Sequence, residues 1–370
     1  MHNKLKVGIL LDDSLDVPDG VQQYVLTIGN WLYQNGHSVY YIVGQTNRKD
    51  ISNVYALAKN FRVSFNGNTM RIPYYSSKSN IKNTLNNLNL DVLHVQMPYS
   101  PFYAGKVINC VSSNVNVVAT FHIAPASNIV THASKALSLI SRGSMGRINS
   151  FISVSKAAQQ FANDTYGIDS TVLPCVITAN TLVHKPIYKK TPHIVFLGRL
   201  VKRKGVILLL EALVKLNKLY NLPYKVSIGG KGAHLNKLQE YAKQNNLSNI
   251  KFLGFVSEEE KVPLLASADI AVFPSTGGES FGIVLLEAMA SGARVVLGGN
   301  NPGYSGVLGG YPKQLIDPKN TIEFANRLKY FLENSKFRQD SYLWNQNEYK
   351  KYDINIVGKD ILNIYYKHKQ

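Results

Sequence analysis

The stretch "GGESFGIVLLEAMASG" (Gly277–Gly292) places two glutamates around an otherwise apolar run. Its apolar residues recur with helical spacing, so the stretch predicts a helix over residues 281–290 that packs against an apolar surface. Glu287 then lies close to a dry face, where an unpaired carboxylate is strongly unfavourable. Glu279 precedes the helix, where glycines leave backbone N–H groups open. The stretch therefore predicts that Glu287 is either paired with another side chain or engaged by a ligand.

Outward from this stretch, short apolar runs alternate with segments of helical spacing along the whole chain. Such alternation is typical of parallel, doubly wound α/β sheets. The runs predicted as strands are residues 6–11, 38–44, 91–96, 116–122 and 150–155 in the first half, and 193–200, 224–232, 250–256, 268–275 and 293–299 in the second.

The chain is long enough for two hydrophobic cores, with 370 residues of which 45% are hydrophobic. Residues 172–193 carry three prolines and no clear period, and we interpret them as a linker. The sequence thus predicts Rossmann-like domains at residues 1–180 and 181–350, with a final helix over 351–370 that packs back on the first domain. Ligands are expected beyond the carboxyl ends of the strands, in a central cleft that the two domains face.

The charge balance favours an anionic partner. The formal net charge is +18, which nucleotide phosphates, anionic lipid headgroups and nucleic acid would all complement. Only Cys110 and Cys175 occur, without the spacing of a metal site, which indicates a reducing compartment and no disulfide framework.

Several motifs together resemble the retaining glycosyltransferases of family four, which have the GT-B fold. The most specific is the Glu-x7-Glu pair of the opening stretch. Arg199 and Lys204 in "FLGRLVKRKG" resemble that family's diphosphate clamp, "GGKG" (Gly229–Gly232) its glycine turn, and "FLGFVS" (Phe252–Ser257) its nucleobase slot.

Within that family the chain most resembles the phosphatidylinositol mannosyltransferases, through "DVPDGVQQYV", "DVLHVQMP" and "VVATFH" ahead of the opening stretch. The resemblance implies transfer of a hexose, with GDP-mannose as donor and a lipid-linked acceptor such as phosphatidylinositol. A UDP-sugar donor with a glycolipid or soluble glycan acceptor is the alternative. The residues implied are His122, Arg199, Lys204 and Glu279 for catalysis, and Gly20, Gly232, Val256, Ser280, Phe281, Gly282, Ile283 and Glu287 for nucleotide binding.

The chemistry of the residues agrees with these roles. A departing nucleoside diphosphate needs positive charge, which Arg199 and Lys204 supply together with amides at a helix N-terminus. Glu279 would accept hydrogen bonds from sugar hydroxyls and Glu287 from the ribose, so that the burial of Glu287 is satisfied only when donor is bound. Ordinary alternatives remain: Glu287 pairs with a basic side chain, or the basic residues form a solvated turn.

A metal ion and a nicotinamide cofactor are not expected. No Asp-x-Asp pair follows a strand of the second half, so basic side chains and amides would replace Mg²⁺ at the diphosphate. Neither "GVQQYV" nor "GGKGAH" completes a dinucleotide-binding fingerprint. The resemblance then implies front-face transfer with retention, in which the leaving phosphate oxygen takes the proton of the acceptor hydroxyl.

Three positions of the first half are open to two interpretations. Gly20 could bind phosphate or make a tight turn, since Asp19 replaces the first of two glycines usual in the family. His122 could serve the acceptor or donor sugar from a strand end, or could be a core histidine. His94 is better explained as a core residue.

A lipid acceptor would require contact with an anionic membrane surface. The predicted contact is "SKALSLISRGSMGR", with Lys135, Arg142 and Arg147, whereas the helix before Asp91 has only Lys78 and Lys82. The expected location is cytoplasmic, peripheral to the inner face of the membrane. A nucleotide-sugar epimerase and a nucleic-acid-binding protein are the alternatives from other classes. The first would need acid and base carboxylates, and no known module supports the second.

Overall fold

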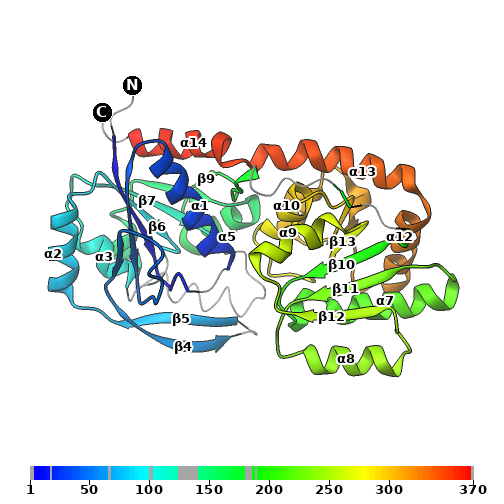
Figure 1. The fold of residues 1–370 in the computed structure, drawn as a ribbon. Helices are drawn as coiled ribbons and strands as arrows, with labels where there is room; N and C mark the ends of the chain where they lie inside the picture. Colours follow the sequence, from blue (N-terminus) through cyan, green and yellow to red (C-terminus); the bar gives the residue numbers. More distant parts are fainter. Residues whose placement is uncertain are drawn as a thin grey trace. The chain divides into compact units, whose positions relative to one another are not determined.

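The chain forms two compact units in a computed structural model (Figure 1). The structure describes residues 4–16, 19–65, 68–98, 100, 103–123, 141–179, 186–187 and 190–367. Unit 1 comprises Met1–Val176 and Ile354–Gln370, and unit 2 comprises Ile177–Asp353. The chain thus leaves the first unit once and returns to it with its last helix.

Unit 1 is built on a parallel seven-stranded sheet with the order β3-β2-β1-β6-β7-β8-β9. Its central strands are buried on both faces, which explains their continuous apolar sequences. The strands are β1 (Lys6–Leu11), β2 (Ser38–Val43), β3 (Val54–Ala56), β6 (Val92–Gln96), β7 (Asn116–Phe121), β8 (Ser150–Ser153) and β9 (Thr171–Val172).

The helices of unit 1 begin at polar caps where the sequence provides them. Ser77 caps α2 and Ser155 caps α5, each by accepting from an amide of the first turn. The helices are α1 (Gly20–Gln34), α2 (Lys78–Leu88), α3 (Ala104–Cys110), α5 (Lys156–Tyr166) and α14 (Ile354–Tyr366).

Helix α14 completes unit 1 from the far end of the sequence. It lies alongside α1 (Figure 1) and contacts β7. The side-chain amide of Asn116 donates to the Tyr365 carbonyl over 3.0 Å. The Tyr365 hydroxyl lies 2.7 Å from Nδ1 of His94, whose Nε2 lies 2.7 Å from the Thr120 hydroxyl. His94 is fully buried with both ring nitrogens hydrogen-bonded, so it is a structural residue of the core.

An antiparallel hairpin, β4 (Lys59–Phe65) with β5 (Asn68–Tyr75), stands apart from this sheet. We did not predict it. The signal was present in the sequence, because an Asn-Gly pair separates two runs rich in strand-forming residues.

Unit 2 is built on a second parallel sheet, of six strands with the order β12-β11-β10-β13-β14-β15. The two sheets confirm the predicted doubly wound α/β fold, and each predicted run contains a strand. The short strands β3, β9 and β15 were not predicted. The strands are β10 (His193–Leu197), β11 (Lys225–Gly229), β12 (Ile250–Gly254), β13 (Ile270–Phe273), β14 (Val295–Gly299) and β15 (Leu315–Ile316).

The core of unit 2 joins these strands to the apolar sides of α7, α8 and α12. On α9, Ser257 and Glu260 form a reciprocal capping box. The helices are α7 (Val206–Leu219), α8 (Leu235–Gln244), α9 (Glu258–Ala266), α10 (Ile283–Ala290), α11 (Pro302–Leu308), α12 (Thr321–Glu333) and α13 (Ser335–Glu348). No helix in the described part of the chain is both long and apolar enough to cross a bilayer.

Helix α10 begins two residues later than the sequence predicted. Gly282 has φ +107° and acts as its N-cap, so Phe281 and Gly282 precede the helix. A Cβ on Gly282 would lie 2.6 Å from the Tyr304 ring, and L side chains rarely adopt this φ. The glycine therefore sets where the helix starts.

We expect Tyr365→Phe to lower the free energy of unfolding of unit 1 by about 1–3 kcal/mol, because it leaves the buried Nδ1 of His94 without its partner. Thermal or urea unfolding would measure the change. Tyr33→Phe is the control, since Tyr33 is 71% exposed. Equal unfolding midpoints for the two variants would contradict the structural role of the His94–Tyr365 contact.

Candidate functional site

The strand order of unit 2 reverses between β10 and β13, which is where ligands of doubly wound sheets bind. Two loops leave the carboxyl ends of these strands. The first contains Arg199 and a 3-10 turn over Lys202–Lys204. The second runs from Pro274 to Gly282. Backbone contacts join them: the Thr276 amide donates to the Arg203 carbonyl over 2.9 Å.

Glu279 is the centre of this loop pair. Its Oε1 lies 2.6 Å from Nη1 of Arg203 and 2.8 Å from Nζ of Lys204. The Ser275 hydroxyl donates to the same oxygen over 2.8 Å. Burial alone would raise the pKa of Glu279, but the charges of Lys204 and Arg203 outweigh it and hold the pKa below its usual range. Glu279 is therefore a carboxylate at neutral pH.

The loop pair retains positive charge after this pairing. Arg203 and Lys204 bring two charges to one carboxylate, and Arg199 follows β10 a few residues earlier. Lys204 and Glu279 were both predicted as site residues, and the structure brings them into contact. Arg203 was not predicted. Its neighbour Lys204 was predicted because it belongs to the "FLGRLVKRKG" motif. Arg203 pairs with Glu279, which lies 76 residues away in the sequence.

Glu287 lies on α10 and is buried. Its Oε1 lies 2.7 Å from Nζ of Lys261 on α9, and Lys261 also contacts Glu258 over 2.5 Å. Burial alone would lower the pKa of Lys261, but Glu287 and Glu258 outweigh it and raise the pKa. The expectation that only a bound donor satisfies Glu287 is therefore wrong, because Lys261 pairs with it.

The remaining predicted nucleotide-binding positions lie around the same strand ends. Gly232 follows β11, and a Cβ there would lie 2.3 Å from the Leu200 carbonyl oxygen, so only glycine allows the two loops to approach. Val256 follows β12. A Cβ on Gly229, at the end of β11, would lie 2.8 Å from Cγ2 of Val256. Ser280, Phe281 and Gly282 directly precede α10, and Ile283 is its first residue.

Gly20 and His122 belong to unit 1. The Gly20 amide donates to the Asp19 carboxylate over 3.0 Å. Phosphate binding at Gly20 stays a prediction. An acidic side chain at this helix start also opposes an anion.

His122 lies directly after β7 and is buried. Its Nε2 donates to the amide oxygen of Gln96 over 2.7 Å, and its ring meets that of Tyr24 edge-on at 4.9 Å. Burial is the larger cause, and the nearby His94 the smaller, of a pKa of His122 that is lowered to about 3. His122 is therefore a neutral imidazole whose Nδ1 is an acceptor.

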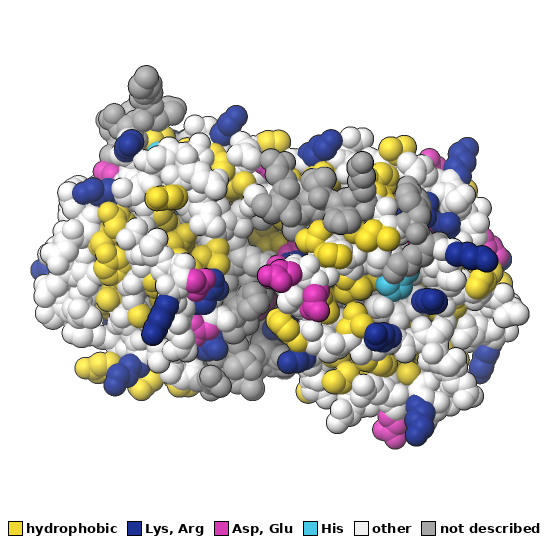
Figure 2. Space-filling view, viewed as in Figure 1, with side chains coloured by type: hydrophobic (Ala, Val, Ile, Leu, Met, Phe, Trp, Pro, Cys, Tyr) yellow, Lys and Arg dark blue, Asp and Glu magenta, His cyan; other side chains and the backbone are white. Residues whose placement is uncertain are grey.

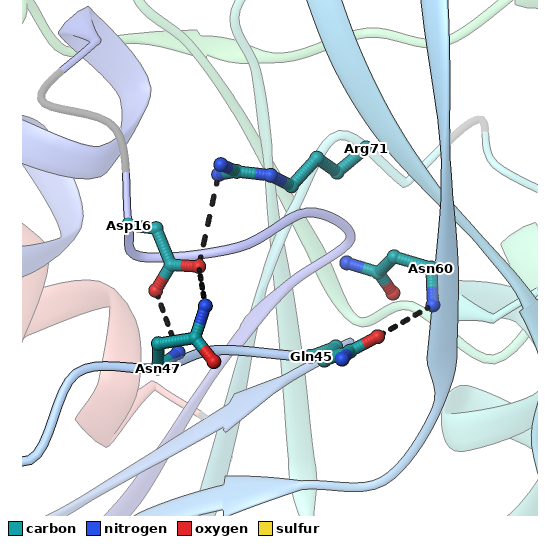
Figure 3. Close-up of a pocket in the computed structure, with 5 residues that line it drawn as sticks. All are labelled: Asp16, Gln45, Asn47, Asn60 and Arg71. Carbon is teal, nitrogen blue, oxygen red and sulfur yellow. Dashed lines mark hydrogen bonds and ion pairs between the residues drawn. The ribbon is translucent and has the colours of Figure 1, made fainter.

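A polar pocket of about 170 Å³ opens in unit 1, lined by Asp16, Gln45, Asn47, Asn60 and Arg71 (Figure 3). Asp16 follows β1, Gln45 and Asn47 follow β2, and the other two come from the β4–β5 hairpin. Sequence analysis identified none of the five, because the hairpin that supplies two of them was not predicted.

The pocket holds one carboxylate in place and leaves an amide unpaired. Asp16 accepts from the Thr46 hydroxyl over 2.6 Å and the Asn47 amide over 2.8 Å, and lies 3.9 Å from Arg71. Burial raises the pKa of Asp16, but these hydrogen bonds outweigh it and lower the pKa overall. The side-chain amide of Asn60 is buried, and neither of its polar atoms has a hydrogen-bond partner in the part of the chain that the structure describes. The pocket thus offers amide groups and a guanidinium to a polar ligand.

Comparison with known proteins places these features in a family. Residues 180–350 match the family described as glycosyl transferases group 1, and residues 18–180 match glycosyltransferase family 4. A phosphatidyl-myo-inositol mannosyltransferase of Propionibacterium freudenreichii subsp. shermanii is 32% identical, over 79% of this chain and 76% of its own. This chain belongs to glycosyltransferase family 4.

A second relative agrees with this family assignment, and a solved structure shares the fold. The phosphatidyl-myo-inositol mannosyltransferase of Mycolicibacterium smegmatis is 27% identical over 98% of this chain and 93% of its own. The Anabaena protein Alr3699/HepE, in its complex with UDP and glucose, superposes with a TM-score of 0.75 at 18% identity, over 97% of this chain and 98% of that one. The glycosyltransferase therefore has the GT-B type of fold, with two Rossmann-like domains.

We expect Lys261→Met to destabilise unit 2 by about 3 kcal/mol, because it leaves Glu287 buried without its counter-charge. The double change Lys261→Met with Glu287→Met should restore most of the loss. Chemical unfolding would measure both. Lys237→Met, on the exposed side of α8, is the matched control. A single variant as stable as this control would show that the ion pair does not support the fold.

Proposed function

We propose that this glycosyltransferase moves a mannosyl group from GDP-mannose to a hydroxyl of phosphatidylinositol, with retention of configuration and without a metal ion. The observation that carries the proposal is the Arg203–Glu279–Lys204 cluster beyond β10 and β13. The names of the two relatives support the choice of sugar and acceptor.

The cluster suits the donor because it combines spare positive charge with a fixed carboxylate. Lys204 and Arg199 would bind the diphosphate. When Lys204 turns to it, Arg203 and Ser275 still hold Oε1 of Glu279. The second oxygen, Oε2, carries none of these contacts, and we assign it to the hydroxyls of the sugar. The two cations that pair with Glu279 would then lie at the diphosphate site.

Glu287 would contact the ribose in a similar way. Lys261 holds its Oε1, and Oε2 is the atom that we assign to the ribose hydroxyls. Because Lys261 fixes the carboxylate beforehand, donor binding need not order it. Val256, next to the end of β12, would contact the nucleobase.

The pocket of unit 1 suits the acceptor headgroup. A cyclic polyol phosphate presents several hydroxyls and one anionic group. The amides of Gln45, Asn47 and Asn60 can bond hydroxyls, and Arg71 can contact the phosphate. The unpaired amide of Asn60 would gain the partners that it lacks.

Transfer would proceed on the face from which the diphosphate leaves. The bond between the anomeric carbon and the phosphate oxygen breaks as the acceptor oxygen bonds that carbon, and the departing phosphate oxygen takes the hydroxyl proton. Arg199 and Lys204 stabilise the charge that develops on this oxygen. Nδ1 of the neutral His122 is an acceptor for a sugar hydroxyl.

Glu279→Ala and Lys204→Ala should each reduce transfer about a hundredfold or more, as expected when a group that stabilises the transition state is removed. The assay follows labelled mannose from GDP-mannose into detergent-dispersed phosphatidylinositol at saturating donor. Lys202→Ala changes an exposed neighbour in the same turn and should retain activity. Near-normal turnover by either site variant would refute the donor assignment, and no transfer by the unchanged protein would refute the choice of substrates.

Transfer should also survive excess EDTA, because cationic side chains occupy the place that Mg²⁺ would take at a diphosphate. Rates with EDTA and with added Mg²⁺ would be compared at equal ionic strength. Loss of transfer on chelation, with recovery on adding Mg²⁺, would contradict the metal-independent mechanism.

A further inference from the structure

The basic side chains of the protein are spread over its surface. Figure 2 shows them scattered over the visible face of both units. In the membrane contact predicted from the sequence, Lys135 lies outside the described residues, and Arg147 donates to the Val111 carbonyl over 2.8 Å. That contact stays a prediction. Surface charge on the visible face singles out no site, and the buried polar groups of unit 1 are more informative.

Gln96 is a polar residue in the middle of the sheet of unit 1. It ends β6, pairs in register with Leu11 of β1 and Thr120 of β7, and is fully buried. The strand order of this sheet reverses between β1 and β6, which is where doubly wound sheets bind ligands. Sequence analysis assigned no role to this residue. Gln96 is thus a buried amide at the ligand-binding end of the sheet.

The backbone that follows Gln96 is strained but held in place. Met97 has φ +58°, in the left-handed region that residues other than glycine rarely adopt. Its amide still donates to the Thr120 carbonyl over 3.1 Å, so contact with β7 extends one residue past Gln96 before the chain turns. Backbone strain of this kind persists where the surrounding structure fixes it, and it is concentrated at functional sites. The end of β6 is therefore a firm support for a side chain.

The side-chain amide of Gln96 makes one hydrogen bond and leaves one group unpaired. Its Oε1 lies 2.7 Å from Nε2 of His122. An amide oxygen cannot donate, so Nε2 of His122 carries the proton. The amide nitrogen of Gln96 is buried and has no hydrogen-bond partner among the described residues. A buried N–H group without a partner is destabilising, so the stability of the core alone does not explain a glutamine here.

Two contacts define the state of the His122 ring. The Tyr24 ring meets it edge-on at 4.9 Å and limits its rotation, and the hydrogen bond to Gln96 selects its tautomer. A neutral imidazole has a single N–H, so a proton on Nε2 leaves Nδ1 as an acceptor. With the pKa of His122 lowered to about 3, the ring is neutral at physiological pH.

The titratable groups found around this pair, in the part of the chain that is described, carry no charge at neutral pH. Tyr24 faces His122 from α1, with Cys175 close to it, and burial raises the pKa of both. Burial lowers the pKa of His94 on β6 to about 3, and it raises the pKa of Tyr365, which faces His94 from α14. The tautomer of His122 therefore depends on a hydrogen bond and not on a neighbouring charge.

We propose that Gln96 is a positioning residue for His122. By accepting from Nε2, it keeps the imidazole in the one tautomer whose Nδ1 can accept a hydrogen bond from a hydroxyl of the donor sugar. The inference rests on the proposed function, in which Nδ1 has that role. The other tautomer, or a protonated ring, would present an N–H at Nδ1 and could not accept. Gln96 acts through His122 and needs no contact with the substrate.

Nitrogen-15 NMR of labelled histidine side chains tests the tautomer in the free protein, with His122→Asn to assign the signal. The His122 ring of the unchanged protein should show a protonated Nε2 and an unprotonated Nδ1 from about pH 6 to about pH 8. Gln96→Met removes the acceptor and should give a mixture of tautomers. A protonated Nδ1 in the unchanged protein, or an unaltered tautomer in Gln96→Met, would overturn the proposal.

Transfer kinetics test whether Gln96 acts through the imidazole. Gln96→Met should reduce transfer from GDP-mannose about tenfold or more, and it should add little to the loss caused by His122→Ala, because coupled residues are not additive. Gln159→Met is the matched control, since it removes a side-chain amide of unit 1 that donates to the Ser170 carbonyl, and it should retain activity. Equal losses with and without His122 would show that Gln96 only supports the fold.

Gln96→Glu provides a second test, which also serves if Gln96→Met does not fold. The new carboxylate still accepts from Nε2. One added proton then puts a hydrogen on Nδ1, either because the ring becomes charged or because the carboxylic acid donates to Nε2 and the ring proton moves to Nδ1. Transfer by this variant should fall about tenfold from about pH 8 to about pH 6, where that of the unchanged protein changes little.

A pH profile of Gln96→Glu that follows that of the unchanged protein would count against the proposal. The NMR measurement separates this inference from the proposed function, because it needs no substrate. If the unchanged protein transfers nothing from GDP-mannose, the proposed function fails, while the ring signals of His122 in the unchanged protein and in Gln96→Met still decide whether Gln96 sets the tautomer.

Discussion

The contact between Glu279 and its two cations is the interaction on which the site depends. It connects the loop after β10 to the loop after β13, the two strands at which the order of the sheet reverses. A largely buried carboxylate is tolerated there because Arg203 and Lys204 pair with it. One carboxylate fixes two cations, and the surplus charge remains for an anionic ligand.

The same principle recurs at Glu287, where Lys261 supplies the counter-charge from a neighbouring helix. In both cases one carboxylate oxygen is anchored by the protein and the other lacks that anchor. Such anchoring favours binding because little side-chain entropy is lost when the ligand arrives. The polar pocket of unit 1 is different, because the side-chain amide of Asn60 has no partner within the described residues.

The sequence predicted the two sheets well because strands buried on both faces are continuous apolar runs. It predicted Glu279 and Glu287 through the Glu-x7-Glu pair and Lys204 through "FLGRLVKRKG", in both cases by resemblance to a known family. It did not predict Arg203 or Lys261 as partners, since each pairs with a residue distant along the chain. Asn60 and Arg71 were missed because their role depends on a hairpin that folds beside the sheet. Helix α10 begins later than predicted because Gly282 has a positive φ. The periodicity of apolar residues gives no information about this backbone conformation.

The most direct test is a titration that compares a nucleoside diphosphate with its own monophosphate. Calorimetry with GDP and GMP would measure what the second phosphate contributes. We expect GDP to bind about tenfold or more tightly than GMP, and Lys204→Ala to remove most of this difference while GMP binding stays nearly unchanged. Equal affinity for GDP and GMP in the unchanged protein would contradict the claim that the Arg203–Glu279–Lys204 cluster is a diphosphate site.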